Sequence, residues 1–200
     1  MNTGIFHRVW RIIRIPLAVI VILFVALVIY RIPAAVERQK TKEAIDKIQA
    51  QKLTLADVLG KNLPPEPDPT LKDATVEGID ANGNGIRDDV ELAIFNLHPD
   101  SAKIRAAELQ YAMELQTELT QVFNSETLVA TIQQEDSGFF CIGDAVPAQS
   151  PNILSKEVEK IVFDTPARAE KHQQVFKSYM TSYKEPNGPY CDVDLASLPN

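Results

Sequence analysis

The stretch DANGNGIRDDVE, residues 80–91, decides how the rest of the chain is interpreted. Its acidic and amide residues recur at alternate positions, with Gly85 at the sixth position and Glu91 at the twelfth. This spacing fits the calcium-loop pattern D-x-[DN]-x-[DN]-G-x5-E, because Ca²⁺ takes about six to eight oxygen ligands and short side chains can turn inward around a tight bend. Glycine at the sixth position provides the bend, since it reaches backbone angles that other residues avoid. We therefore predict a calcium site whose oxygens come from Asp80, Asn82, Asn84, the backbone carbonyl of Ile86, Asp88 and Glu91.

These twelve residues resemble an EF-hand-type calcium-binding loop. They are most similar to the D-x-D-x-D-G-I-x-D variant of thrombospondin type 3 repeats and bacterial cell-envelope proteins. The resemblance covers residues 80–91 alone and implies calcium as the cofactor, and no family is recognised for the whole chain. The pattern departs from an EF-hand at Arg87, where an apolar residue usually pairs with a second loop, and no second copy of the motif occurs in the sequence. A single calcium site is therefore implied, with an unoccupied polar turn as the alternative.

The charge at the predicted ligand positions comes only from Asp80, Asp88 and Glu91, because Asn stands at two of the positions. Few charged ligands and a single site predict weak binding, with a Kd of about 10⁻⁴ to 10⁻³ M, as in extracellular modules. Such a site is filled outside a cell and empty in the cytosol. We therefore expect calcium to have a structural role.

The N-terminal residues predict a membrane anchor. Residues 12–30 contain one charged residue, Arg14, and nineteen helical residues span about 28 Å, close to the thickness of the hydrocarbon core. Trp10 and Tyr30 stand where interfacial aromatic residues are common, and Pro16 is expected in the first helical turn, where proline is tolerated. The alternative is a cleaved signal peptide, although a small-x-small cleavage site is missing after the apolar run.

The charge of the chain is distributed unevenly. Residues 1–33 hold four arginines and no acid, so residues 34–200 carry 16 basic and 27 acidic residues, a net charge of −11. Such an acidic domain is a poor candidate for nucleic-acid binding, which begins with a basic patch. The basic tail favours a cytoplasmic N-terminus and an extracytoplasmic domain, periplasmic or extracellular. In an oxidising compartment we expect the two cysteines, Cys141 and Cys191, to form a disulfide, with two buried free thiols as the alternative.

The patterning predicts a mainly α fold, in which a single transmembrane helix precedes a small helical domain with one EF-hand-like calcium loop and a disulfide. The expected parts are a tail at 1–11, a signal anchor at 12–30, a juxtamembrane helical stalk at 31–63, a proline-rich linker at 64–79 and the domain at 80–200. Little helical periodicity precedes the loop, so we expect the incoming helix of an EF-hand to be absent or reduced. After the loop, apolar periodicity and capping residues predict five helices. The first ends before Pro99, and the second is capped by Asp100 or Ser101. The third is opened by Asn124 or Ser125 and ended by Gly138. After a loop at 143–154 come a short helix capped by Ser155 and a last helix that starts at Thr165-Pro166.

No pattern of catalytic residues is found. His7, His98 and His172 have no second His or Cys at zinc-ligand spacing, and Arg168, Glu170 and His172 are expected on a solvated helix face rather than in a cleft. We therefore expect a protein that is not an enzyme. The predicted function is a membrane-anchored, extracytoplasmic calcium-binding protein that acts as an interaction or scaffold module in the cell envelope. Its expected partners are the membrane, through residues 12–30, and another envelope protein. The alternative is a membrane-anchored hydrolase with an unrecognised acidic active site.

Overall fold

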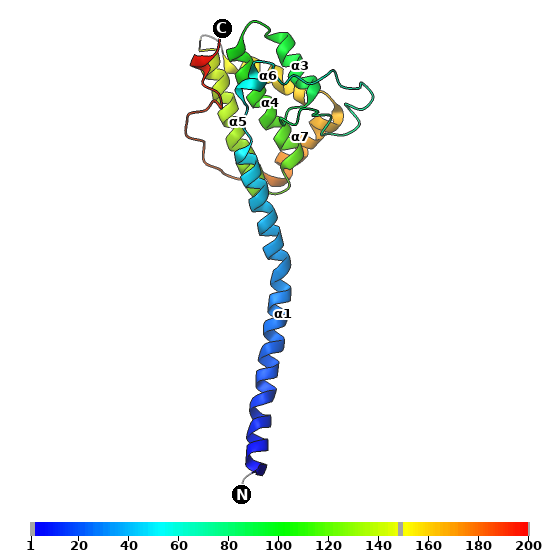
Figure 1. The fold of residues 1–200 in the computed structure, drawn as a ribbon, viewed down its shortest axis with the longest axis vertical. Helices are drawn as coiled ribbons and strands as arrows, with labels where there is room; N and C mark the ends of the chain where they lie inside the picture. Colours follow the sequence, from blue (N-terminus) through cyan, green and yellow to red (C-terminus); the bar gives the residue numbers. More distant parts are fainter. Residues whose placement is uncertain (1–2, 148–149, 200) are drawn as a thin grey trace. The chain divides into compact units, whose positions relative to one another are not determined.

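The computed structural model describes residues 3–147 and 150–199. Within these residues it is helical and contains no strand, which confirms the mainly α prediction (Figure 1). The helices are α1 (Thr3–Ala50), α2 (Leu55–Val58), α3 (Asp88–Leu97), α4 (Ala102–Gln121), α5 (Ser125–Ala145), α6 (Pro151–Val162), α7 (Pro166–Tyr179) and the 3₁₀ helix η1 (Leu195–Ser197). The chain divides into two units between Glu43 and Ala44.

The first unit consists of most of helix α1. The helix is long enough and apolar enough, by length and composition, to cross a membrane, as predicted for residues 12–30. Its apolar side chains, among them Leu23 and Ile29, are exposed, as is expected for a surface that protein does not cover. Pro16 lies in the interior of α1, not in its first turn, because the helix already begins at Thr3. The predicted stalk is helical up to Ala50, where α1 ends.

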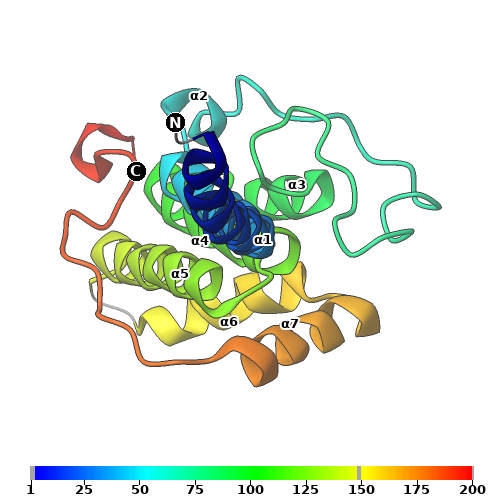
Figure 2. The same cartoon turned by 90° about the horizontal axis from the view of Figure 1, so that it is seen from below.

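The second unit is built around α4. Helices α2, α3, α5, α6 and α7 all contact α4, and Figure 2 shows them around it. Apolar residues of α4 such as Leu109, Ala112 and Leu115 are almost fully buried and form the centre of the core. Burial of these side chains is the main stabilising contribution of the unit, because it removes apolar surface from water.

The second unit begins at Ala44 and not at Asp80, the predicted start of the domain. Ile48, Leu53 and Val58 are buried, with 5% or less of each side chain exposed, so the end of α1 and the segment after it contribute to the core. Few apolar residues occur at 34–51, which is why the sequence predicts a stalk there. No helix lies between α2 and α3, which confirms the prediction that a helix leading into the loop is absent or reduced.

Several helix boundaries follow their predicted signals. Ser101, Asn124 and Thr165 cap α4, α5 and α7, and each side chain accepts a hydrogen bond from a backbone N–H of the first turn. Two boundaries were wrong. Gly138 does not end α5, and a Cβ at this position would collide with the Glu114 carboxylate, so the glycine permits close packing of α5 on α4. Helix α6 begins at Pro151 with Ser155 buried inside it, because proline at the first helical position starts the helix earlier.

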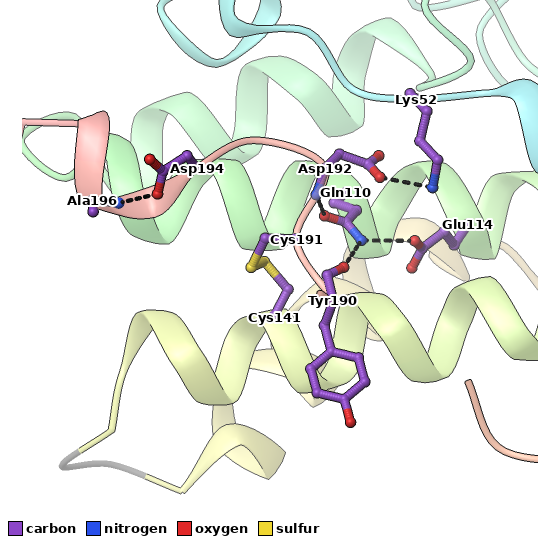
Figure 3. Close-up of a disulfide and its surroundings, with 9 residues drawn as sticks. All are labelled: Lys52, Gln110, Glu114, Cys141, Tyr190, Cys191, Asp192, Asp194 and Ala196. Atoms are coloured by element: carbon purple, nitrogen blue, oxygen red, sulfur yellow. Dashed lines mark hydrogen bonds and ion pairs between the residues drawn. A yellow bond between two sulfur atoms is a disulfide. The ribbon is translucent and has the colours of Figure 1, made fainter. Parts of the chain in front are cut away.

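The C-terminal segment is attached to the helical core by a disulfide. Cys141 on α5 and Cys191 are joined with a Cα–Cα distance of 5.0 Å, which confirms the predicted disulfide (Figure 3). Gln110 of α4 holds the same segment, since its Nε2 donates to the Tyr190 carbonyl at 2.9 Å and its Oε1 accepts from the Asp192 N–H at 2.8 Å. Asp192 also accepts a hydrogen bond from the backbone N–H of Leu53. The tail thereby links α4, α5 and the segment that follows α1.

Candidate metal centre

The loop at residues 80–91 is closed at its base and folded around Asp80. The backbone N–H of Asp88 donates to the Ile79 carbonyl at 2.8 Å, which brings the two ends of the loop together. The Asp80 carboxylate accepts hydrogen bonds from the backbone N–H groups of Gly83, Asn84 and Gly85, at 2.8, 3.2 and 2.9 Å. Gly83 and Gly85 have φ angles of +71° and +88°, which glycine adopts without steric cost. The two glycines therefore let three donors turn toward one carboxylate.

The side chains of Asn82 and Asn84 converge on Glu91. Their amide nitrogens donate to Glu91 Oε2 at 2.9 and 3.0 Å, while their oxygens accept from the backbone N–H groups of Asn84 and Ile86. A cation beside Glu91 would replace these two donors, and both amides would have to turn their oxygens toward it.

Asp88 and Glu91 are buried and keep carboxylate oxygens without partners. The two side chains are 1% and 0% exposed, and neither Asp88 Oδ2 nor Glu91 Oε1 accepts a hydrogen bond. Burial raises the pKa of Asp88, and it raises the pKa of Glu91 to about 7 although both asparagines oppose the shift. Leaving a buried acceptor unpaired is costly, whereas a cation satisfies it. These orphaned oxygens fit the predicted calcium ligands Asp88 and Glu91.

Ile86 and Arg87 fix the loop to the helical core. The Ile86 side chain is fully buried, so this residue anchors the loop while its carbonyl is the predicted ligand. Arg87 is 1% exposed and donates to the carbonyls of Ile161 and Val162 at the end of α6, at 3.2 and 3.1 Å. The position that would pair with a second EF-hand therefore binds the protein's own helix.

A second buried arginine fixes the segment before the loop. Arg168 on α7 is 0% exposed and pairs with Asp73 and Asp164 at 2.7 Å each. It also donates to the Lys72 and Val76 carbonyls. The prediction of a solvated face was wrong for Arg168, because its guanidinium binds carbonyls of the preceding segment. Glu170 is exposed as expected, and His172 Nδ1 lies 2.8 Å from Glu118 Oε2.

Among the described residues, two groups of three metal-type side chains place ligand atoms within 4.8 Å of one another. They are Asp73, Asp89 and Asp164, and His98, Glu108 and Glu157. The three carboxylates of the aspartate group are paired with three cations, Arg87, Arg168 and Lys72, which leaves no need for a metal ion. The loop carboxylates do not form such a group, so the predicted calcium site depends on its asparagine and backbone oxygens.

The second group was not predicted from the sequence, because its members come from three separate segments. Glu108 stands one residue before Leu109 on the buried helix α4, and this position among core residues is the signal that would have identified it.

A cavity of about 520 Å³ opens beside the loop. Asp80, Asn84 and Gly85 line one part of it, and the side chains of Gln51, Gln116 and Gln121 contribute amides to the rest. Amide groups offer both donors and acceptors, as a peptide backbone requires. The cavity therefore suits a polar ligand or an extended peptide segment.

Comparison with protein-family models gave no match, and neither curated proteins nor solved structures gave one.

Proposed function

We propose that residues 80–91 bind Ca²⁺ and that the chain is a membrane-anchored, extracytoplasmic calcium-binding protein. The observation that carries the proposal is the pair of buried carboxylate oxygens, Asp88 Oδ2 and Glu91 Oε1, that have no hydrogen-bond partner. Calcium would satisfy both oxygens, and a hard cation is suited to an all-oxygen ligand set. The ligands are Asp80, Asn82, Asn84, the carbonyl of Ile86, Asp88 and Glu91.

A structural role for calcium is supported by the connections of the loop. The Ile86 side chain is buried in the core, and Arg87 binds the end of α6. Four loop residues, Asp80, Gly83, Asn84 and Gly85, also line the neighbouring cavity. Calcium would therefore hold one wall of this cavity in place, and we propose that the domain acts as an interaction or scaffold module that binds an envelope partner there.

The first experiment is thermal unfolding of the full chain in detergent micelles, with EGTA and with increasing Ca²⁺. We expect the melting temperature to rise with a midpoint at about 10⁻⁴ to 10⁻³ M, because a ligand of the folded state stabilises it by mass action. Asp80→Ala and Glu91→Gln should lose the rise, while the exposed control Glu170→Gln should retain it. Absence of a shift in the unmodified protein at tens of millimolar Ca²⁺ would mean that the loop is an unoccupied polar turn.

The compartment is tested with the cysteines. An extracytoplasmic domain should keep Cys141 and Cys191 oxidised, so an alkylating reagent applied to native membranes should add mass to them only after reduction. Alkylation without prior reduction would place the domain in a reducing compartment.

The interaction role is tested with a photo-crosslinking residue at Thr120, an exposed position in the lining of the cavity. We expect a discrete adduct in native membranes that is lost with EGTA or with Asp80→Ala. The same residue at Lys160, which is exposed on α6 and does not line the cavity, is the matched control. Equal adducts from both positions would contradict the proposal.

A further inference from the structure

Three helices bring His98, Glu108 and Glu157 together away from the calcium loop. His98 directly follows α3, Glu108 lies on α4 and Glu157 lies on α6. One ligand atom from each residue lies within 4.8 Å of the other two, and His98 Nε2 is 3.1 Å from Glu108 Oε1. Packing of the helices therefore creates a group of one nitrogen and two oxygen ligands.

Glu108 has no hydrogen-bond partner although it is completely buried. Its side chain is 0% exposed, and neither carboxylate oxygen takes part in a hydrogen bond. The contact with His98 is short, but it lacks the geometry of a hydrogen bond, so Nε2 of His98 is also unpartnered. Burial, reinforced by the charge of Glu157, raises the pKa of Glu108 to about 8. A carboxylate in this position is costly to ionise unless a cation accompanies it.

The surroundings favour a neutral imidazole at His98. Burial lowers the pKa of His98, and the nearby Arg105 lowers it further, while Glu157 acts in the opposite direction. The Arg105 guanidinium is occupied by the carbonyls of His98 and Pro99, to which it donates at 2.8 and 2.7 Å. Neutral imidazole is the form that binds metal ions. The His98 side chain is 20% exposed, which gives an ion access from solvent.

We propose that His98, Glu108 and Glu157 form a binding site for a divalent transition-metal ion, with Zn²⁺ as the best fit. An imidazole nitrogen beside two carboxylates suits Zn²⁺, whereas Ca²⁺ is bound by oxygen ligands. Three protein ligands leave a coordination position for water. An ion here connects the end of α3 with α4 and α6.

The other buried acid–histidine pair is a weaker candidate. Glu118 and His172 already form a hydrogen bond of 2.8 Å, and they are not part of a three-ligand group. This pair provides a matched control, because it contains the same residue types joined by a hydrogen bond.

The proposal is tested by titrating the full chain in micelles with Zn²⁺ in a calorimeter, in about 2 mM Ca²⁺ so that the loop is occupied. We expect one Zn²⁺ per chain. His98→Gln and Glu108→Gln should each weaken binding at least about tenfold. Co²⁺ should give a visible absorption band in the unmodified protein that both variants lose. His172→Gln and Glu170→Gln should keep the affinity and the band.

Three results would overturn the site. They are no heat and no Co²⁺ band in the unmodified protein, unchanged affinity in Glu108→Gln, or loss of binding in His172→Gln instead of His98→Gln. If Glu108→Gln does not fold by circular dichroism, Glu157→Gln tests the same ligand group from a partly exposed position. Asp80→Ala should keep the Zn²⁺ affinity, which separates this site from the calcium loop.

Discussion

The loop at residues 80–91 and the His98–Glu108–Glu157 group have the same physical signature but arise differently. In both, a buried carboxylate keeps oxygens without a hydrogen-bond partner, at Glu91 in the loop and at Glu108 in the group. The loop collects its ligands from twelve consecutive residues, whereas the group collects them from three helices that only the folded core brings together. A local pattern is visible in a sequence, and a group made by packing is not.

The comparison also predicts different metal selectivity. The predicted ligand atoms of the loop are all oxygens, and the group includes an imidazole nitrogen. Ca²⁺ prefers oxygen ligands, whereas Zn²⁺ also binds imidazole nitrogen well. The two regions should therefore respond independently to the two ions.

The largest expected effect is loss of the disulfide, which lies in neither metal region. Replacing Cys141 and Cys191 together by serine should lower the free energy of unfolding by about 4 kcal/mol, because the bond closes a long loop of the unfolded chain. Their separation in sequence is 50 residues. Denaturant unfolding measures the loss, and both Ca²⁺ and Zn²⁺ should still stabilise the variant. Loss of either metal response would show that the responses depend on global stability and not on their own ligands.

Arg87→Met should have the next largest effect and should act on one region only. The substitution removes a buried guanidinium from Asp89 and Asp164 and leaves the Ile161 and Val162 carbonyls without it. We expect a loss of about 3 kcal/mol, since removing one partner of a buried ion pair leaves the others uncompensated. The Ca²⁺ response should weaken because the loop loses its attachment to α6.

The matched control is Lys72→Met. Lys72 contacts the same Asp89 at 3.9 Å, but its side chain is 34% exposed, so the loss should stay below about 1 kcal/mol. Zn²⁺ binding should be unchanged in both variants. Equal losses of stability would mean that the burial of Arg87 contributes nothing.

Much of the fold was predictable because its signals are local. Capping residues and proline positions predicted the starts of α4, α5 and α7. The presence of two cysteines predicted the disulfide between them. Predictions failed where a tertiary contact determines the role of a residue. Gly138 has the properties of a helix end, yet it serves helix packing, and Arg168 has the properties of a surface residue, yet it binds backbone carbonyls.

The candidate sites divide in the same way. The predicted ligands of the loop follow from their spacing, and the proposed zinc ligands do not, because His98 and Glu157 are 59 positions apart. Calcium itself stays a prediction until the loop is titrated.

The two regions should lower the free energy of unfolding in different pH ranges. The folded-state pKa of Glu91 is about 7 and that of Glu108 about 8, both above the usual value of 4.5. Protonation of each group therefore stabilises the folded protein below pH 4.5, and this contribution is lost as the pH rises through 7 for Glu91 and through 8 for Glu108. Each loss should be on the order of 3 kcal/mol, since one pKa unit corresponds to about 1.4 kcal/mol.

Unfolding with chelators at pH 5 to 8 measures these losses. Glu91→Gln should remove the part that ends near pH 7, and Glu108→Gln the part that ends near pH 8. Ca²⁺ should suppress only the first part and Zn²⁺ only the second, since each ion holds its carboxylate in the charged form. A difference between variant and unmodified protein that does not change with pH would contradict the burial argument.

The smallest expected effect distinguishes two glycines within the loop. Gly83 and Gly85 both have positive φ angles, so alanine at either position should cost about 1 kcal/mol through the backbone alone. A Cβ at Gly83 meets no atom within 4 Å, whereas a Cβ at Gly85 collides with the side-chain amide of Gln51. Gln51 accepts a hydrogen bond from Gln121 at 3.2 Å, and moving it breaks this bond. Gly85→Ala should therefore lower the melting temperature more than Gly83→Ala, and neither should change Zn²⁺ binding. Equal shifts would mean that Gln51 moves aside freely, and the loop would then be held by its own turns and not by its contact with the segment after α1.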